Sequence, residues 1–346
     1  MKTDLFDYLL PVDRIAQEPR PRGASRLLVL DRKTGAISHR NFADFPSLLS
    51  AGDVLVRNDV AVRNARLWGR DEKGRLVEIF LLAPLGSDQT RWSALAKPGR
   101  RAKRDRTISL PGGASARIGG VHPDGRREAE FDRPIDDRYL ETHGAVPLPP
   151  YIRRKPGAPD RPEDRAGYQT VFAREPLAVA APTAGLHFTE ESFEAIRARG
   201  AAVADLTLAV GAGTFKPVTA AEIEEHAMEA EQVSIPPETL RAIDAARSRG
   251  GRVVAAGTTV TRSLEAAARL PAASGSPRRF ATNLFIAPGF DFRGIDALLT
   301  NFHLPRSTLL MLVCAFAGRE RVLAAYEEAI RKDYLFYSFG DAMFIA

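Results

Sequence analysis

The pattern of apolar, polar and turn-forming residues changes twice along the chain, and these changes constrain the fold more than any other feature. From about Leu67, short segments of alternating apolar and polar residues are separated by closely spaced Gly, Pro and Asp turns, and none has a helical period. This pattern is typical of a small antiparallel β-barrel or sandwich. The segments that we expect to be strands are Leu76–Leu82, Trp92–Lys97, Thr107–Leu110, Ala114–Ile118 and Arg127–Phe131.

After Tyr168 the chain alternates between apolar runs and amphipathic segments, which indicates an α/β layer architecture. The predicted strands are Leu177–Ala181, Ala202–Val210, Arg252–Ala256, Asn283–Ala287 and Leu335–Phe339. The predicted helices are Glu190–Arg199 with Thr189 as its cap, Pro237–Arg249, Val260–Leu270 and two helices around 307–332. Within residues 1–66 we expect two short strands, Arg26–Asp31 and Asp53–Asn58.

These patterns together predict an α/β (mixed α+β) main domain with a smaller inserted antiparallel β-barrel domain. We expect residues 1–66 and 148–346 to form the main domain and residues 67–147 to form the insertion. The proline-rich stretch 147–164 marks the return from the barrel. A length of 346 residues is sufficient for two domains.

Composition narrows the class of protein. Hydrophobic residues make up 45% of the chain and charged residues 27%, and no apolar run approaches the roughly 20 residues of a membrane-spanning helix. The beginning of the chain does not resemble a secretory signal. Cys314 is the only cysteine, so an internal disulfide and a multi-cysteine metal site are excluded, and its apolar surroundings favour a buried thiol. We expect a cytoplasmic enzyme without membrane association.

The net charge of +6 is unevenly distributed. One run of ten residues carries six cations and a single acid, Asp105, and its cations are Lys97, Arg100, Arg101, Lys103, Arg104 and Arg106. Clustered Lys and Arg bind a phosphate backbone by releasing condensed counterions. Charge alone nevertheless favours a solvated basic hairpin, so both interpretations stand at this point.

Three glycine-containing turns follow predicted strands of the α/β part, in VAAPTAGLHF, LAVGAGTF and VVAAGTTVTR. In open α/β sheets ligands bind beyond the carboxyl ends of the strands. The spacings GxGxxG and GxxxxGK[ST] are absent, so neither a dinucleotide fingerprint nor a phosphate loop is present. Three such turns indicate a nucleoside-like ligand. The candidate binding residues are Thr183, Gly185, Gly211, Gly213, Thr214, Gly257, Thr258 and Thr259.

The stretch TNFHLPRSTLLMLVCAFAG, residues 300–318, joins a polar turn to a run of apolar residues. It predicts a loop that leads into a buried helix capped by Ser307. The loop presents Asn301, His303 and Arg306 near the start of that helix, where polar and anionic ligands are favoured. The spacing alone fits equally well a capped core helix that follows a loop whose polar side chains have no role in binding.

Six histidines are present, and no HExxH or similar motif accompanies them, so we expect no metal. His187 and His303 lie in turns beside predicted strand ends, which suits proton transfer or ligand binding.

Many short blocks along the whole chain resemble the S-adenosylmethionine:tRNA ribosyltransferase-isomerase family, which acts in queuosine biosynthesis. Besides residues 300–318, the resemblance rests on FDY at 6–8, SRLL at 25–28, GDVLV at 52–56, PLPPYI at 147–152, YQTV at 168–171, AAPTAGLHF at 180–188, VGAGTF at 210–215, GTT at 257–259 and GDAM at 340–343.

The resemblance implies a two-domain fold and a transferase that modifies tRNA. The ribosyl part of S-adenosylmethionine, a co-substrate, passes to 7-aminomethyl-7-deazaguanine at the tRNA wobble position. It isomerises to give epoxyqueuosine-tRNA, and adenine and methionine leave. No retained cofactor and no metal are implied, and we expect a monomer or weak homodimer.

The family motifs supply the positions of the candidate residues, and the roles are our own assignment from the chemistry of the reaction. We assign His187 and His303 to proton transfer, Asp341 to an orienting or acidic role, and Arg262 to the methionine carboxylate through a bidentate fork. An RNA substrate turns the basic run Lys97–Arg106 into a candidate tRNA-binding segment.

The chain departs from the family pattern at several positions. Val60-Ala61 replaces a usual Thr-Arg pair, Ala209 and Glu229 replace usual histidines, and Val260-Thr261 replaces Ser-Val. Loss of an imidazole removes a group that titrates near neutral pH. Two alternatives therefore stay open: a divergent paralogue that uses S-adenosylmethionine with another acceptor, and a non-catalytic tRNA-binding relative.

Overall fold

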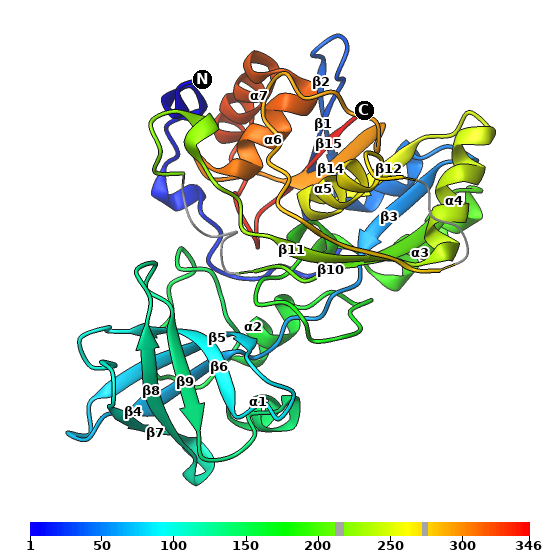
Figure 1. Cartoon of the computed structure of the whole chain (residues 1–346). Coiled ribbons are helices and arrows are strands. Elements are labelled where there is room, and N and C mark those ends of the chain that lie inside the picture. Colours follow the sequence, from blue (N-terminus) through cyan, green and yellow to red (C-terminus); the bar gives the residue numbers. More distant parts are fainter. Residues whose placement is uncertain (212–217, 272–275) are drawn as a thin grey trace.

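The computed structural model describes residues 1–211, 218–271 and 276–346. Two bodies are visible in Figure 1: a large mixed sheet flanked by helices, and a smaller barrel built from one continuous stretch of chain. The structure therefore confirms the predicted fold class, an α/β main part with a smaller antiparallel barrel.

The large sheet has nine strands in the order β13-β11-β10-β3-β12-β14-β15-β1-β2. At its centre β10, β3, β12 and β14 run parallel to one another. The remaining neighbours pair antiparallel, except for β1 with β15. The strands are β1 Arg26–Leu30, β2 Ile37–Asn41, β3 Val54–Asn58, β10 Ala202–Leu208, β11 Glu231–Ile235, β12 Val253–Ala256, β13 Arg278–Thr282, β14 Ala297–Asn301 and β15 Ala342–Ile345.

Helices cover both faces of this sheet, so β3, β12 and β14 are buried along their whole length rather than at alternate residues. Successive side chains of a strand point to opposite faces. Val54 and Val56 of β3 pack in one core and Leu55 packs in another, with Phe45 and Phe193. The helices are η3 Phe42–Leu48 and α3 Glu190–Ala198 on the Leu55 side, and α4 Pro237–Ser248, α5 Thr258–Ala267, α6 Thr308–Ala317 and α7 Arg319–Arg331 on the other.

Local signals set the ends of several helices. The Thr189 hydroxyl accepts from the Ser192 amide and caps α3, and Ser307 does the same for α6 through the Leu310 amide. Both caps confirm predictions.

The thiol of Cys314 is buried within α6, and burial raises its pKa to about 12. None of the helices in the described ranges is long and apolar enough to cross a membrane.

The barrel closes in the order β4-β5-β6-β9-β8-β7, because β7 pairs back onto β4. Its antiparallel strands confirm the predicted segments and add one at the beginning. They are β4 Arg66–Arg70, β5 Leu76–Pro84, β6 Arg91–Lys97, β7 Thr107–Ser109, β8 Ser115–Val121 and β9 Arg127–Phe131. Inward-facing residues such as Val77, Ile79 and Trp92 form a separate core, so the barrel is filled by side chains.

Three predicted strands are wrong. Leu177–Ala181 forms only an isolated bridge between Ala178 and Val62. Asn283–Ala287 lies after the true strand β13, whose charged sequence RRFAT belongs to a sheet edge with one exposed side. Leu335–Phe339 is a buried turn, and the closing strand β15 follows it. An apolar run shows that a segment is buried, and it does not show that its backbone pairs with a neighbour.

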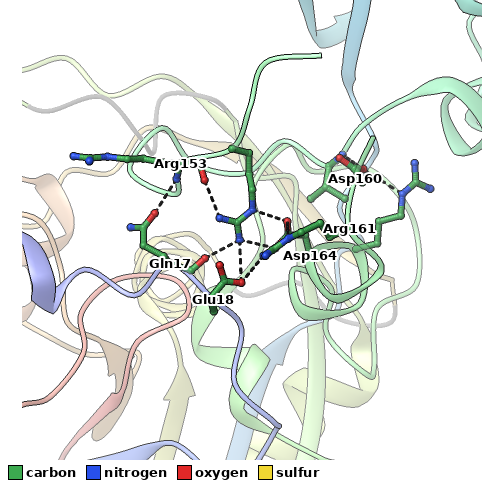
Figure 2. A network of polar contacts seen from close by, with 9 residues as sticks. Gln17, Glu18, Arg153, Asp160, Arg161 and Asp164 are labelled. Atoms are coloured by element: carbon green, nitrogen blue, oxygen red, sulfur yellow. Dashed lines mark hydrogen bonds and ion pairs between the residues drawn. The ribbon is translucent and has the colours of Figure 1, made fainter. Parts of the chain in front are cut away.

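After the last barrel strand the chain forms α1 Asp137–His143 and then α2 Pro162–Gly167, and α2 lies between the two bodies (Figure 1). A buried carboxylate anchors this region to the N-terminal segment (Figure 2). Asp164 of α2, only 2% exposed, receives two hydrogen bonds from Arg154 and two from Arg161. Glu18 also accepts from Arg161, and Gln17 accepts from the Arg153 amide. The charges hold α2 and residues 17–18 together.

Candidate active site

Several chain segments end or begin at one edge of the large sheet. The carboxyl ends of β10, β3, β12 and β14 meet there because these strands are parallel. The beginnings of β15 and β1 lie at the same edge, since β15 runs antiparallel to β14 and parallel to β1. This is the edge at which open α/β sheets bind ligands. Two neighbouring hollows lie at it.

The first hollow, which we call the cavity, is the more enclosed of the two and has a volume of about 70 Å³. It brings together six of the predicted site residues from three separate turns: Thr183, Gly257, Thr258, Thr259, His303 and Ser307. Most of its other lining residues are apolar or aromatic, among them Val210, Phe302, Tyr151 and Tyr337, and Thr300 and Ser338 add two hydroxyl groups. A mixture of hydroxyl groups and aromatic walls is suited to a nucleoside-like ligand.

Two helices begin at the cavity. At α5, Gly257 has a φ of +105°, a conformation that residues with a Cβ rarely adopt, and its amide donates to the Leu299 carbonyl. The Thr258 side chain lines the cavity and is buried, and its hydroxyl has no hydrogen-bond partner among the described residues. Ser307, which also lines the cavity, caps α6. The amides of a helix's first turn that remain unpaired favour an anionic group nearby.

His303 is buried at the cavity wall and is held at three points. Its backbone amide donates to the Tyr326 hydroxyl, its carbonyl accepts from the Tyr8 hydroxyl, and its Nε2 lies 2.7 Å from Thr300 Oγ1. The Thr300 hydroxyl also donates to the Asn301 carbonyl at 3.3 Å. When the Thr300 hydroxyl proton lies in that bond, the Thr300 oxygen accepts from His303 Nε2–H. In this tautomer the lone pair of the imidazole lies on Nδ1.

Burial lowers the pKa of His303 to about 3. The ring is therefore neutral at pH 7 and can accept a hydrogen bond or a proton. A general base works best with a pKa near the working pH. A pKa of about 3 makes His303 a weak base until negative charge develops beside it.

The second hollow, which we call the cleft, is more open and has a volume of about 360 Å³. His187 lies in its wall, with Nδ1 2.8 Å from Ser25 Oγ and a buried Nε2 that has no partner among the described residues. Burial lowers the pKa of His187 to about 4; the nearby Arg22 and Arg20 act in the same direction, and Asn301 opposes them.

Ser338 lines both the cavity and the cleft, so the two hollows are neighbours. Its hydroxyl lies 2.7 Å from the Tyr151 hydroxyl, which belongs to the return from the barrel. His303 and His187 thus face two adjoining spaces rather than one. The sequence did not single out Tyr151, Thr300, Ser338, Arg20 or Arg22 as site residues, although Tyr151 and Thr300 lie in blocks that carry the family resemblance.

Asp341 does not contact either histidine. Its buried carboxylate accepts from Arg20 Nη1 and from the backbone amides of Arg26 and Leu335, each at 2.8 Å. These bonds tie the beginning of β1 to the turn before β15. The structure places Asp341 as an anchor for Arg20 and the backbone, not as a group that is free to orient His187 or His303.

Arg262 lines neither the cavity nor the cleft. Its Nη1 pairs with Glu231, which is buried with it, and its Nε donates to the Leu284 carbonyl. The fork predicted for a methionine carboxylate is therefore partly used within the protein. Nη2 is buried and has no partner among the described residues. The same Glu231 accepts from the Gly211 amide at 3.1 Å.

The remaining predicted binding residues differ in their surroundings. Arg306 is exposed and pairs with Asp7. A Cβ on Gly185 would come within 2.9 Å of Phe172, so this glycine allows close packing beneath the cavity. Asn301 is buried, donates to the Tyr337 carbonyl, and leaves Oδ1 without a partner in the described part of the chain. Gly213 and Thr214 lie outside the described residues.

The basic run lies on the barrel, between β6 and β7. Lys97, Arg100 and Lys103 are exposed and form no ion pair with any described residue. Arg101 is folded back and donates to the Leu76 carbonyl, and Arg104 lies 3.8 Å from Asp105. Three of the five candidate nucleic-acid contacts are thus free cations on the surface.

Two of the departures from the family pattern can be placed. Ala61 lines a third hollow, of about 390 Å³, together with Arg63, Arg165 and Arg174, and a longer side chain there would extend into this space. Ala209 follows β10, and its amide donates to the Gln232 carbonyl. Within the described ranges no group of three or more His, Cys, Asp or Glu side chains is arranged to hold a metal ion.

Comparisons with known proteins extend over the full length of the chain. A family model described as queuosine biosynthesis protein matches residues 3–345. Proteins named S-adenosylmethionine:tRNA ribosyltransferase-isomerase from Moorella thermoacetica and Thermotoga maritima are 49% and 47% identical, and each alignment covers 100% of both chains. The crystal structure of the S-adenosylmethionine tRNA ribosyltransferase of Thermotoga maritima is similar, with a TM-score of 0.56, 40% identity and coverage of 99% of this chain and 100% of that one. The chain therefore belongs to the S-adenosylmethionine:tRNA ribosyltransferase-isomerase family of queuosine biosynthesis proteins.

Proposed function

We propose that this protein is an S-adenosylmethionine:tRNA ribosyltransferase-isomerase of queuosine biosynthesis. The proposal rests on one observation: the chain is 47–49% identical to proteins of that name, and the alignments cover 100% of both chains. The enzyme transfers the ribosyl group of S-adenosylmethionine to 7-aminomethyl-7-deazaguanine in tRNA and isomerises it to an epoxycyclopentane. Adenine and methionine are released.

S-adenosylmethionine binds in the cavity. The hydroxyl groups of Thr183, Thr258 and Thr259 can bond the ribose, and the first turn of α5 can receive the methionine carboxylate in place of Arg262. At about 70 Å³ the cavity is smaller than the roughly 300 Å³ of a typical small-ligand site. The walls must therefore move apart when the ligand enters.

His303 is the candidate to remove the proton from the ribose 5′ carbon, which the adjacent sulfonium acidifies. It lines the cavity, and the bond to Thr300 directs its Nδ1 lone pair away from that residue. His187, in the cleft, is the candidate to act on the acceptor side. Asp341 supports the site indirectly by holding Arg20.

The barrel binds tRNA. Residues 67–147 form an inserted domain whose exposed cations Lys97, Arg100 and Lys103, joined by Arg104, contact phosphates. Their affinity for RNA is electrostatic and independent of sequence, so base recognition falls to the main domain.

The test incubates the protein with S-adenosylmethionine and a tRNA that carries 7-aminomethyl-7-deazaguanine. Release of adenine with a matching mass increase of the nucleoside supports the proposal. Release only with another acceptor identifies a divergent paralogue, which the substitutions at Ala61, Ala209 and Glu229 motivate. Binding of tRNA without any adenine release identifies a non-catalytic relative.

A further inference from the structure

We propose that the cleft is the subsite for the acceptor nucleobase and that Glu163 reads the hydrogen-bond donors of its Watson–Crick edge. This assignment rests on the proposed function, because it divides the two substrates between the two hollows. The cleft is lined by residues 19–22, 166–167 and 338–340, together with Glu163, Ser25, Leu186 and His187.

The size of the cleft fits a single base. Its volume of about 360 Å³ falls at the lower end of the range for small-molecule sites, whereas the cavity is five times smaller. An enzyme that modifies a base in a nucleic acid takes that base out of the stack into a pocket. A base attached to tRNA requires an opening to solvent, and the cleft is the more open of the two hollows.

The cleft is preformed, because its two banks are bonded together. Arg22, one of the lining residues, donates to the carbonyls of Leu186, Ala166 and Gln169 and so joins the segments that form the walls. The Asp164 network in Figure 2 holds the same banks from behind, since Glu18 precedes Pro19 and Asp164 lies between Glu163 and Ala166. A site with fixed walls loses little entropy when a ligand enters.

The polar groups of the cleft can bond to a deazaguanine. Glu163 is exposed at the rim and has no partner among the described residues, so its carboxylate can accept from the N1–H and the exocyclic amine of the base. His187, which lines the same wall, is buried, and its Nε2 has no hydrogen bond of ordinary length to a described residue, although the Asn301 side chain is near enough to raise its pKa.

The position of the cleft also suits the transfer. Ser338 forms part of both walls, so a base in the cleft lies next to whatever occupies the cavity. The aminomethyl group of the acceptor can therefore approach a ribosyl group bound beside Thr258 and His303 without either substrate moving between sites.

The decisive variant is Ala166→Trp. Ala166 is exposed on α2 and lines the cleft, so a large side chain can obstruct the space without replacing any hydrogen-bonding group or any core residue. The matched control is Ala195→Trp, an exposed alanine on α3 that lines none of the described hollows. Glu163→Gln removes the charge and keeps the shape of the proposed reading residue.

We expect Ala166→Trp to raise the KM for tRNA carrying 7-aminomethyl-7-deazaguanine at least tenfold and to leave the dissociation constant of S-adenosylmethionine within twofold. Glu163→Gln should lower kcat/KM for that tRNA about tenfold, the discrimination typical of one bidentate base contact. Ala195→Trp should match the wild type. Unchanged tRNA kinetics in Ala166→Trp, or a loss of S-adenosylmethionine binding alone, overturns the assignment.

A second measurement separates this inference from the proposed function. Equilibrium binding of the free base 7-aminomethyl-7-deazaguanine to the wild type and to Ala166→Trp requires no turnover. If the wild type releases no adenine, the proposed function fails. If the wild type binds the free base and Ala166→Trp binds it more weakly, the cleft is the base site even in that case. If both proteins bind the base equally well, the acceptor binds elsewhere, whatever the activity of the wild type.

Discussion

The free cations of the barrel provide a quantitative test of how the protein holds tRNA. Lys97, Arg100 and Lys103 are exposed and unpaired among the described residues, whereas Arg101 is bonded to a backbone carbonyl. The triple variant Lys97→Gln, Arg100→Gln, Lys103→Gln therefore removes three charges and leaves Arg101, which supports the fold of the segment, in place.

The expected magnitude follows from counterion release. Each phosphate contact contributes about 0.9 to the slope of log affinity against log salt on a duplex and about 0.7 on a single strand. Three lost contacts reduce the slope by about 2 to 3. At 0.1 M salt the same relation corresponds to roughly 100- to 500-fold weaker tRNA binding. Binding of S-adenosylmethionine should not change, because exposed charges act over a Debye length of only about 10 Å at this salt concentration.

Fluorescence anisotropy of labelled tRNA across a series of NaCl concentrations measures both quantities. The matched control neutralises Arg197, Arg241 and Arg249, three exposed arginines of the main body that form no ion pair with a described residue. If the barrel variant keeps the wild-type slope, or if the control loses as much affinity as the barrel variant, the basic run is not the tRNA-binding surface.

Three further predictions concern stability. The guanidinium groups of Arg154 and Arg161 hold the pKa of Asp164 at about 2, below its unfolded value of 3.8, so this stabilisation is complete above pH 3.8 and disappears as the pH falls through 2. Asp164→Asn should cost up to about 2 kcal/mol of unfolding free energy at pH 7, measured by urea titration, and an equal midpoint to the wild type would contradict this. Burial holds the pKa of His303 at about 3 rather than 6.5, so the unfolded chain binds the extra proton and stability falls from pH 6.5 toward pH 3. His303→Gln should flatten this decline in thermal melts, and an unaltered decline counts against a buried neutral ring. Ser307→Ala removes the cap of α6 and should cost about 1 kcal/mol, seen as faster amide exchange in its first turn, while unchanged exchange would show that the cap contributes nothing.

Local chemistry determined much of the fold. Alternating short segments between turns predicted the barrel strands, because the period of two along a strand is a property of the backbone itself. Thr189 and Ser307 identified the beginnings of α3 and α6 correctly, since a cap bonds only to amides within its own first turn. Three predicted strands failed for the complementary reason. Whether the apolar run at 335–339 pairs with a neighbour depends on segments far away in the chain.

The glycine turn at residues 257–259 pointed to the cavity from sequence alone, because it follows β12 and parallel strands bring their carboxyl ends to one edge. Thr183 also lines the cavity, although the strand predicted before its turn does not form. Only the tertiary structure showed that His187 and His303 face two hollows separated by Ser338.

Long-range partners decided the rest. Arg262 and Asp341 looked available for substrate in the sequence, but Glu231 and Arg20 engage them through contacts across 31 and 321 residues. A charged side chain that is buried must find a counter-charge, and which one it finds is set by the fold and not by its neighbours in sequence.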